Sequence, residues 1–381
     1  MPARSTTVLR KCRSFPVTTR NWILAILILL TIICILIKVD FIHVNLSRLP
    51  RPLSRPPNLK LRLGLISDIH YVDAKDGFNL SNNRSRYYRL GPSRLREAVG
   101  HWRSERVDAV LQLGDLLDGS SHRSDHRDAD FAEMSRIVDS LTVPWHHSVG
   151  NHERYGFGEE ELRQWIGRAS RFKLDKDNYY FFSPVAGLVI VMLHSYEISE
   201  IYKSGGKAGR DFDPRRVDEA HKQLVKNNPN TNVNSHLGLT GLGRRWVAYT
   251  GGLGADQLTW LNRTLHKAKR EKNKVIIASH APLHPSALVT PMHLAWDYEK
   301  ALNVIRGVGK GVVIAALAGH DHEGGFYLSP EVNNVLFYTL NGVVETEPSS
   351  AAFAIVDVYP DKLHIRGFGN EPNFVLPFDS F

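Results

Sequence analysis

Five short polar motifs, each placed at the end of an apolar run, constrain this 381-residue chain more than any other feature. The apolar runs span residues 61–66, 107–113, 143–149, 275–278 and 312–317, and their nearly consecutive apolar positions are typical of strands buried on both faces. In open α/β sheets the functional site lies beyond the carboxyl ends of the strands. The sequence therefore predicts an α/β fold in which the motifs meet at one edge. They are Ser67-Asp68-Ile69-His70, Gly114-Asp115-Leu116-Leu117-Asp118, Gly150-Asn151-His152-Glu153, Ala278-Ser279-His280 and Gly319-His320-Asp321-His322.

The side chains in these motifs predict a site for two divalent metal ions. Carboxylate, amide and imidazole groups are ligands that suit Mn, Fe or Zn. A two-metal site holds its ions about 3.5–4 Å apart and needs a bridging carboxylate. We expect Asp115 to bridge, because it lies centrally between the two ligand sets. The expected ligands are Asp68, His70 and His322 for one ion, and Asn151, His280 and His320 for the other.

Two bound ions would lower the pKa of a water, so that hydroxide is available near neutral pH, and would polarise phosphoryl oxygens for attack. His152 follows the expected ligand Asn151, and on an extended turn its side chain would point away from that ligand and toward substrate. We expect His152 to act as general acid for the leaving oxygen, or to stabilise the transition state as a donor. We expect Asp118 and Glu153 to accept hydrogen bonds that orient the ligand imidazoles.

The net charge of +9 belongs entirely to the first 60 residues. They hold ten Lys/Arg and one acidic residue, which leaves 38 Lys/Arg and 38 Asp/Glu in residues 61–381. A neutral body lacks the basic face that nucleic-acid binding requires, so no nucleic-acid partner is expected. Both cysteines, Cys12 and Cys34, also precede residue 60, so the body uses neither a disulfide framework nor thiolate ligands.

The N-terminal arm contains one long apolar segment, from Trp22 to Ile37, in which Thr31 is the polar member. With Lys38 reaching toward the headgroups, residues 22–41 are just long enough to span a bilayer. The sequence therefore predicts a basic tail at 1–21, a single transmembrane helix at 22–41, a proline-rich linker at 42–60 and one catalytic domain at 61–381. We expect a single-pass membrane protein with its N-terminal tail in the cytoplasm. The alternatives are a signal peptide, a buried helix and a mitochondrial presequence.

At the five motifs the chain resembles the calcineurin-like metallophosphoesterase superfamily. Further segments resemble one branch of it, the manganese-dependent ADP-ribose/CDP-alcohol diphosphatases, and the similarity covers roughly residues 61–370. The chain departs from that branch at His70, where animal members often carry Gln, and at His194, where Asp is expected. The segments that carry the resemblance are Asp76-Gly77-Phe78-Asn79, Arg86-Tyr87-Tyr88-Arg89, Asn228-Pro229-Asn230-Thr231, Gly251-Gly252-Leu253-Gly254, Leu294-Ala295-Trp296 and Gly342-Val343-Val344-Glu345-Thr346.

This resemblance implies a four-layer α/β/β/α sandwich and a pair of divalent ions, with Mn²⁺ expected and Fe or Zn as alternatives. It also implies cleavage of the pyrophosphate bond in a small nucleotide-diphosphate substrate, ADP-ribose or a CDP-alcohol. The products would be a nucleoside monophosphate and a phospho-sugar or phospho-alcohol.

Aromatic side chains near the site favour such a substrate, because a base needs a stacking surface. We expect Phe78, Tyr88 and Trp296 to bind substrate, and the alternative is that such aromatics belong to the core. Two other functions remain open: a phosphomonoesterase or protein phosphatase on the same two-metal core, and an inactive, membrane-tethered binding module.

Overall fold

The computed structural model describes residues 55–79, 83–123, 126–172, 174, 177–201 and 212–380. Contacts divide the chain into two units, Met1–Arg55 and Pro56–Phe381, and the second unit contains every element named below.

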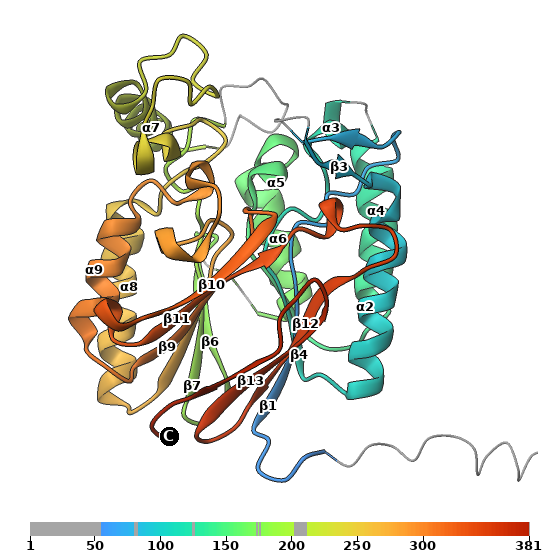
Figure 1. Cartoon of the computed structure of the whole chain (residues 1–381), viewed down its shortest axis with the longest axis vertical. Coiled ribbons are helices and arrows are strands. Elements are labelled where there is room, and N and C mark those ends of the chain that lie inside the picture. The colour runs from blue at the N-terminus through green and yellow to red at the C-terminus, as the bar shows by residue number, and fades with distance from the viewer. Residues whose placement is uncertain are drawn as a thin grey trace, which may run out of the picture. The chain divides into compact units, whose positions relative to one another are not determined.

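Two six-stranded sheets form the centre of this unit (Figure 1). In each sheet the strands that precede the polar motifs are parallel neighbours, which brings their carboxyl ends to the same edge. The first sheet has the order β14 (Phe374–Pro377), β13 (Lys362–Gly369), β12 (Ala352–Val358), β1 (Leu61–Ile66), β4 (Ala109–Gln112), β5 (Trp145–His147). The second has the order β10 (Glu323–Ser329), β11 (Val335–Asn341), β9 (Val313–Ala318), β8 (Lys274–Ala278), β7 (Leu188–Met192), β6 (Tyr180–Val185).

Helices cover the outer faces of the two sheets and complete four layers, as Figure 1 shows. α2 and α4 lie beside the first sheet, and α8 and α9 lie beside the second. α6 packs beside β5 of the first sheet, and the remaining helices and a short hairpin lie at or near the edge where the motifs meet. The helices are α2 (Gly91–Glu105), α3 (Gly119–Arg123), α4 (Arg127–Asp139), α5 (Asn151–Gly156), α6 (Glu159–Ser170), α7 (Pro214–Asn227), α8 (Gly254–Arg270) and α9 (Tyr298–Val308), and the hairpin joins β2 (Gly77–Phe78) to β3 (Ser85–Arg86).

The residues of β7 show why the central strands are apolar on consecutive positions. Leu188 and Ile190 pack in the cluster that joins the two sheets. Val189 and Val191 pack in a second cluster, together with residues of α8 and α9. Because successive side chains point to opposite faces, a strand covered on both faces must be apolar at every position.

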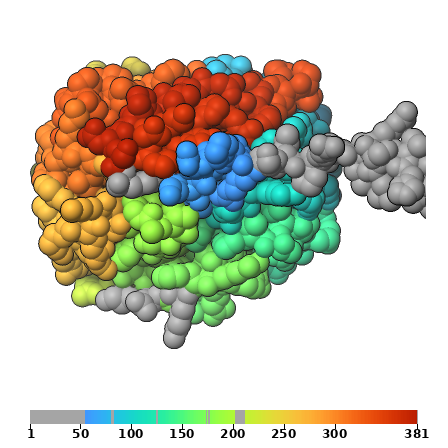
Figure 2. Space-filling model, turned by 90° about the horizontal axis from the view of Figure 1, so that it is seen from below, coloured from blue at the N-terminus to red at the C-terminus, as the bar shows by residue number. Residues whose placement is uncertain are grey.

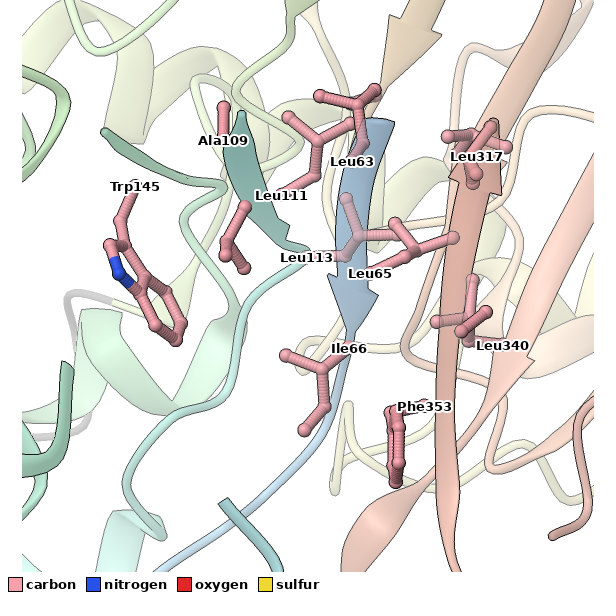
Figure 3. Close-up of a cluster of buried hydrophobic side chains, with 14 of the residues drawn as sticks. Leu63, Leu65, Ile66, Ala109, Leu111, Leu113, Trp145, Leu317, Leu340 and Phe353 are labelled. Atoms are coloured by element: carbon pink, nitrogen blue, oxygen red, sulfur yellow. The ribbon is translucent and has the colours of Figure 1, made fainter. Parts of the chain in front are cut away.

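The core between the sheets is continuous from one sheet to the other. Leu63 and Leu65 of β1 belong to the same buried cluster as Leu317 of β9 and Leu340 of β11, and Figure 3 shows these side chains facing one another. Burial of each leucine contributes about 1.5–3 kcal/mol, so this contact holds the two sheets in a fixed alignment.

The end of the chain completes the first sheet. β12 pairs antiparallel with β1, with Leu63 opposite Val356. Figure 2 accordingly shows the blue start of the described chain beside the red C-terminal segment. This pairing places β1 in the interior of the sheet, where Asp68 follows it.

The prediction of a membrane anchor is corrected here. The expected transmembrane helix at 22–41 lies outside the described residues, as do the basic tail and most of the linker. Among the helices that the structure describes, none is both long and apolar enough to cross a bilayer. Over the described residues the fold is therefore a mixed α/β sandwich with no helix that could cross a membrane, and neither the membrane as a partner nor the single-pass localisation is retained.

Two glycines near Trp102 give a test of the packing between α2 and β1. A Cβ atom added to Gly64 would lie 2.7 Å from the buried indole of Trp102, whereas one added to Gly100, on α2, would meet nothing within 4 Å. We predict that Gly64→Ala destabilises the protein by about 1–3 kcal/mol through overpacking. The control Gly100→Ala should stabilise it by about 0.5–1 kcal/mol, because Ala loses less backbone entropy in a helix. Urea unfolding followed by circular dichroism measures both, and equal stability of the two variants would contradict the packing.

Candidate metal centre

The five motifs meet where the carboxyl ends of both sheets converge. Asp68 follows β1, Asp115 follows β4 and Asn151 follows β5 in the first sheet. His280 follows β8 and His320 follows β9 in the second sheet, and His322 directly precedes β10. The structure thus brings all seven predicted ligands together.

Four of these residues have left-handed backbone conformations. The φ angles are 54° at Asp68, 50° at His70, 56° at Asp115 and 68° at His320. Such a conformation costs a non-glycine residue about 1–3 kcal/mol, so the surrounding fold must impose it. These strained residues cluster at strand ends that carry polar side chains. Such clustering of backbone strain is typical of a functional site.

The first predicted ligand set is compact. The Nε2 atoms of His70 and His322 lie 3.2 Å apart. The Oδ1 atom of Asp68 lies 3.6 Å from the former and 3.4 Å from the latter. These three groups are close enough to share one ion.

The second set adjoins the first through Asp115. The Nε2 atom of His280 lies 3.1 Å from Nδ1 of His320 and 3.3 Å from Oδ1 of Asn151. The Oδ2 atom of Asp115 lies 3.4 Å from this Nε2 and 3.3 Å from Nε2 of His70 in the first set. A single carboxylate oxygen therefore faces both sets, as a bridging ligand requires.

Two observations show that the residues fit a pair of cations. The buried Oδ1 of Asp68 accepts no hydrogen bond from any residue that the structure describes, although it faces three imidazoles. Burial disfavours ionisation of Asp115, but the imidazoles of His280, His152 and His70 outweigh it and hold the pKa of this carboxyl below its usual value. Both carboxylates are thus ionised acceptors, and with imidazole and amide they form a donor set suited to Mn²⁺.

The imidazoles respond to the same charges. Burial alone would lower the pKa of His280, yet the Asp115 carboxylate raises it to about 9. Glu345 and Asp68 likewise raise the pKa of His322 to about 9 against the effect of burial. An imidazole nitrogen must be deprotonated to ligate a metal. Metal ions and protons therefore compete for the ligating nitrogen of His280 and for that of His322.

Neighbouring groups fix the orientation of three of the four ligand imidazoles. Asp118 lies 3.3 Å from Nδ1 of His70, the placement that was predicted for it. Glu345, which sequence reasoning did not assign, lies 2.8 Å from Nδ1 of His322. The carbonyl of Leu113 lies 2.7 Å from Nδ1 of His280. Such partners set the tautomer and raise the basicity of a ligating histidine.

Glu153 has a different position from the one predicted. It does not reach an imidazole but accepts hydrogen bonds from the backbone N–H groups of Asp115, Leu116 and Gly150, at 2.7, 2.7 and 2.8 Å. Burial and the nearby Asp115 charge raise the pKa of Glu153 to about 7. Its carboxyl therefore holds the loop that carries Asp115, and acts on the ligand through the backbone.

His152 lies in the first turn of α5 and not on an extended turn as predicted. Its ring stands edge-on to that of His70, with centroids 4.3 Å apart. The N–H of Gly119 donates to Nδ1 of His152 at 2.6 Å, so that in the neutral ring the proton resides on Nε2. Burial lowers the pKa of His152, which favours the neutral ring, and its Nε2–H can donate a hydrogen bond.

A cavity of about 370 Å³ opens over the two ligand sets. Phe78 and Tyr88 line it, as predicted for substrate-binding residues, and Phe78 is 62% exposed. The sequence reasoning assigned no role to the other lining residues. Arg86 lies on β3, in a segment that resembles the diphosphatases. The rest lie on loops and short helices without a motif of their own, and they are Arg123, Tyr155, Asn234, Tyr249 and His293.

Trp296 is corrected from a substrate-binding residue to a core residue. It is 1% exposed and belongs to a small cluster with Ile198, Ala220 and Leu224. Its ring packs against Trp246 at a centroid distance of 5.3 Å. It does not line the cavity.

Comparison with known proteins agrees with this fold and site. The sequence model of the calcineurin-like phosphoesterase family matches residues 61–324, and the chain belongs to that family. The manganese-dependent ADP-ribose/CDP-alcohol diphosphatase of Bos taurus is 35% identical over 328 residues, which cover 83% of this chain and 93% of the relative. The enzyme of that name from Arabidopsis thaliana is 32% identical, with 80% and 93% covered.

Among solved structures, a dimetal phosphatase from Danio rerio is similar to this chain with a TM-score of 0.78 at 34% sequence identity. The match covers 84% of this chain and all of that one. The resemblance that was predicted from the motifs is confirmed.

The central position of Asp115 leads to a prediction about metal binding. We expect Asp115→Asn to lower Mn²⁺ affinity by more than the 10–100-fold that a substitution outside the ligand shell typically costs, because it removes a charge shared by both sets. Equilibrium dialysis with metal analysis measures the affinity, and circular dichroism checks the fold. The control is Asp361→Asn, at an exposed position near the start of β13. Full Mn²⁺ occupancy with unchanged affinity in Asp115→Asn would disprove the bridging role.

Proposed function

We propose that this protein hydrolyses the pyrophosphate bond of ADP-ribose and CDP-alcohols with two divalent metal ions, for which Mn²⁺ is the expected metal. The observation that carries the proposal is the shared Asp115 carboxylate, whose Oδ2 lies within 3.4 Å of one imidazole from each ligand set. The relatives named as manganese-dependent ADP-ribose/CDP-alcohol diphosphatases support the choice of metal and substrate.

The shape of the site suits a substrate with two parts. Next to the 370 Å³ cavity lies another of about 190 Å³. Both are lined by Arg86, Tyr249, His293, His320 and His322, so they meet at the metal ligands. A pyrophosphate over the ligands could therefore extend into both cavities. Phe78, on the larger side, offers an exposed ring on which a base can stack.

The residues of the chain have separable tasks in this reaction. Two bound ions supply charge neutralisation and a water of lowered pKa. Asp118 and Glu345 hold the rings of His70 and His322 in place. His152 carries a proton on Nε2 at the cavity wall, and this N–H can donate a hydrogen bond that stabilises the charge developing on the departing oxygen. Positioning and neutralisation of charge then provide most of the acceleration, as is general for phosphoryl transfer.

A product assay tests the proposed function. The purified protein is incubated with Mn²⁺ and, separately, with ADP-ribose, CDP-choline, CDP-glycerol and p-nitrophenyl phosphate, and products are separated by anion-exchange chromatography. We expect AMP and ribose 5-phosphate from ADP-ribose, and CMP and the phospho-alcohol from the CDP-alcohols. Chelation of the metal should abolish the reaction. Turnover of p-nitrophenyl phosphate alone would instead establish a phosphomonoesterase.

His152 provides a prediction that separates catalysis from metal binding. We expect His152→Ala to retain both metals and to lose about 10²–10³-fold in kcat, the usual cost of removing a donor that stabilises developing charge. The loss should shrink for substrates whose leaving group is stable without such a donor. Metal content that falls in proportion to activity would instead make His152 a ligand.

A further inference from the structure

Two arginine side chains line the larger cavity, and they differ in their partners. The Nε atom of Arg86 lies 2.9 Å from Glu345, which in turn holds His322, so its charge is already balanced within the site. Arg123 is exposed and forms no ion pair with any residue that the structure describes. It is therefore a permanent positive charge at the cavity that no described carboxylate neutralises.

The short helix α3 connects Arg123 to the backbone group that contacts His152. The helix begins at Gly119, whose N–H donates to Nδ1 of His152, and it ends at Arg123. Four residues of helix advance about 6 Å, which an arginine side chain can span. Arg123 and His152 both line the larger cavity, so a leaving group that contacts His152 lies in the same cavity as this cation.

The leaving group distinguishes a pyrophosphate from a simple phosphate ester. In pyrophosphate hydrolysis the oxygen of water bonds to one phosphorus, and the bond from that phosphorus to the bridging oxygen breaks. The electron pair stays on the bridging oxygen, which becomes a terminal oxygen of the second phosphate. The departing phosphate thus gains negative charge. An alcohol or phenol that leaves a single phosphate carries no phosphate of its own.

We propose that Arg123 binds the departing phosphate and so makes the enzyme prefer pyrophosphates to esters of a single phosphate. This inference rests on the proposed function and names the residue that sets its substrate class. A guanidinium presents paired N–H donors that match phosphate oxygens, and its charge does not depend on pH in the working range.

A pair of substrates that share a nucleoside phosphate isolates this role. ADP-ribose has a phosphate as leaving group, whereas the p-nitrophenyl ester of thymidine 5′-monophosphate releases nitrophenol. We expect Arg123→Gln to lower kcat/KM for ADP-ribose by about 10–100-fold, the factor expected from loss of a charged hydrogen bond. The value for the nitrophenyl ester should not change. Arg123→Lys, which keeps the charge but not the paired donors, should recover part of the loss.

The controls separate the possible failures. Arg263→Gln, at an exposed position on α8, should match the wild type on both substrates. Equal losses on the two substrates in Arg123→Gln, or no loss on ADP-ribose, would overturn the role of Arg123. Wild-type protein that cleaves the nitrophenyl ester but no pyrophosphate would overturn the proposed function itself, and the assignment of Arg123 with it. Unchanged Mn²⁺ content in the variants excludes damage to the metal ligands.

Discussion

The site depends on the burial of negative charge at the junction of the two sheets. Asp68 and Asp115 are 0% and 1% exposed, and ionised carboxylates at such depth are stable only when opposite charge is close. The facing imidazoles provide part of that compensation, and two divalent ions would provide the rest. The left-handed backbone, the Glu153 carboxyl beneath the Asp115 loop and the carboxylate partners of the histidines all serve to hold this arrangement.

The glycines of the motifs are part of the same constraint. A Cβ atom on Gly319 would lie 2.5 Å from Oδ2 of Asp68, and one on Gly150 would lie 2.0 Å from Oδ1 of Asp115. Both positions therefore require a residue without a side chain, because the backbone passes directly against a buried carboxylate. The motifs therefore require glycine at these positions for steric reasons, in addition to the polar side chains that could bind the metals.

Sequence reasoning could identify the α/β fold and the ligand candidates because both leave regular signals, whereas the four-layer sandwich followed from the family resemblance. Consecutive apolar positions indicate strands covered on two faces, and the polar residues that end them indicate the functional edge. The residues that were missed or misplaced lack such signals. Arg123 and Glu345 lie on short helices, and their roles depend on neighbours distant in sequence. Trp296 was misplaced for a different reason. It lies in a segment that resembles the diphosphatases, but its side chain belongs to the core.

The ligands come from both sheets, with Asp68, Asp115 and Asn151 on one and His280 and His320 on the other. Their spacing is therefore set by how the sheets pack, through side chains such as Leu63 and Leu317 that touch neither substrate nor metal. A fraction of an ångström of sliding between the layers would alter the distance between the two ions. Metal affinity therefore depends on the packing of the hydrophobic core between the sheets. Bound ions would in turn stabilise the two sheets against sliding past each other.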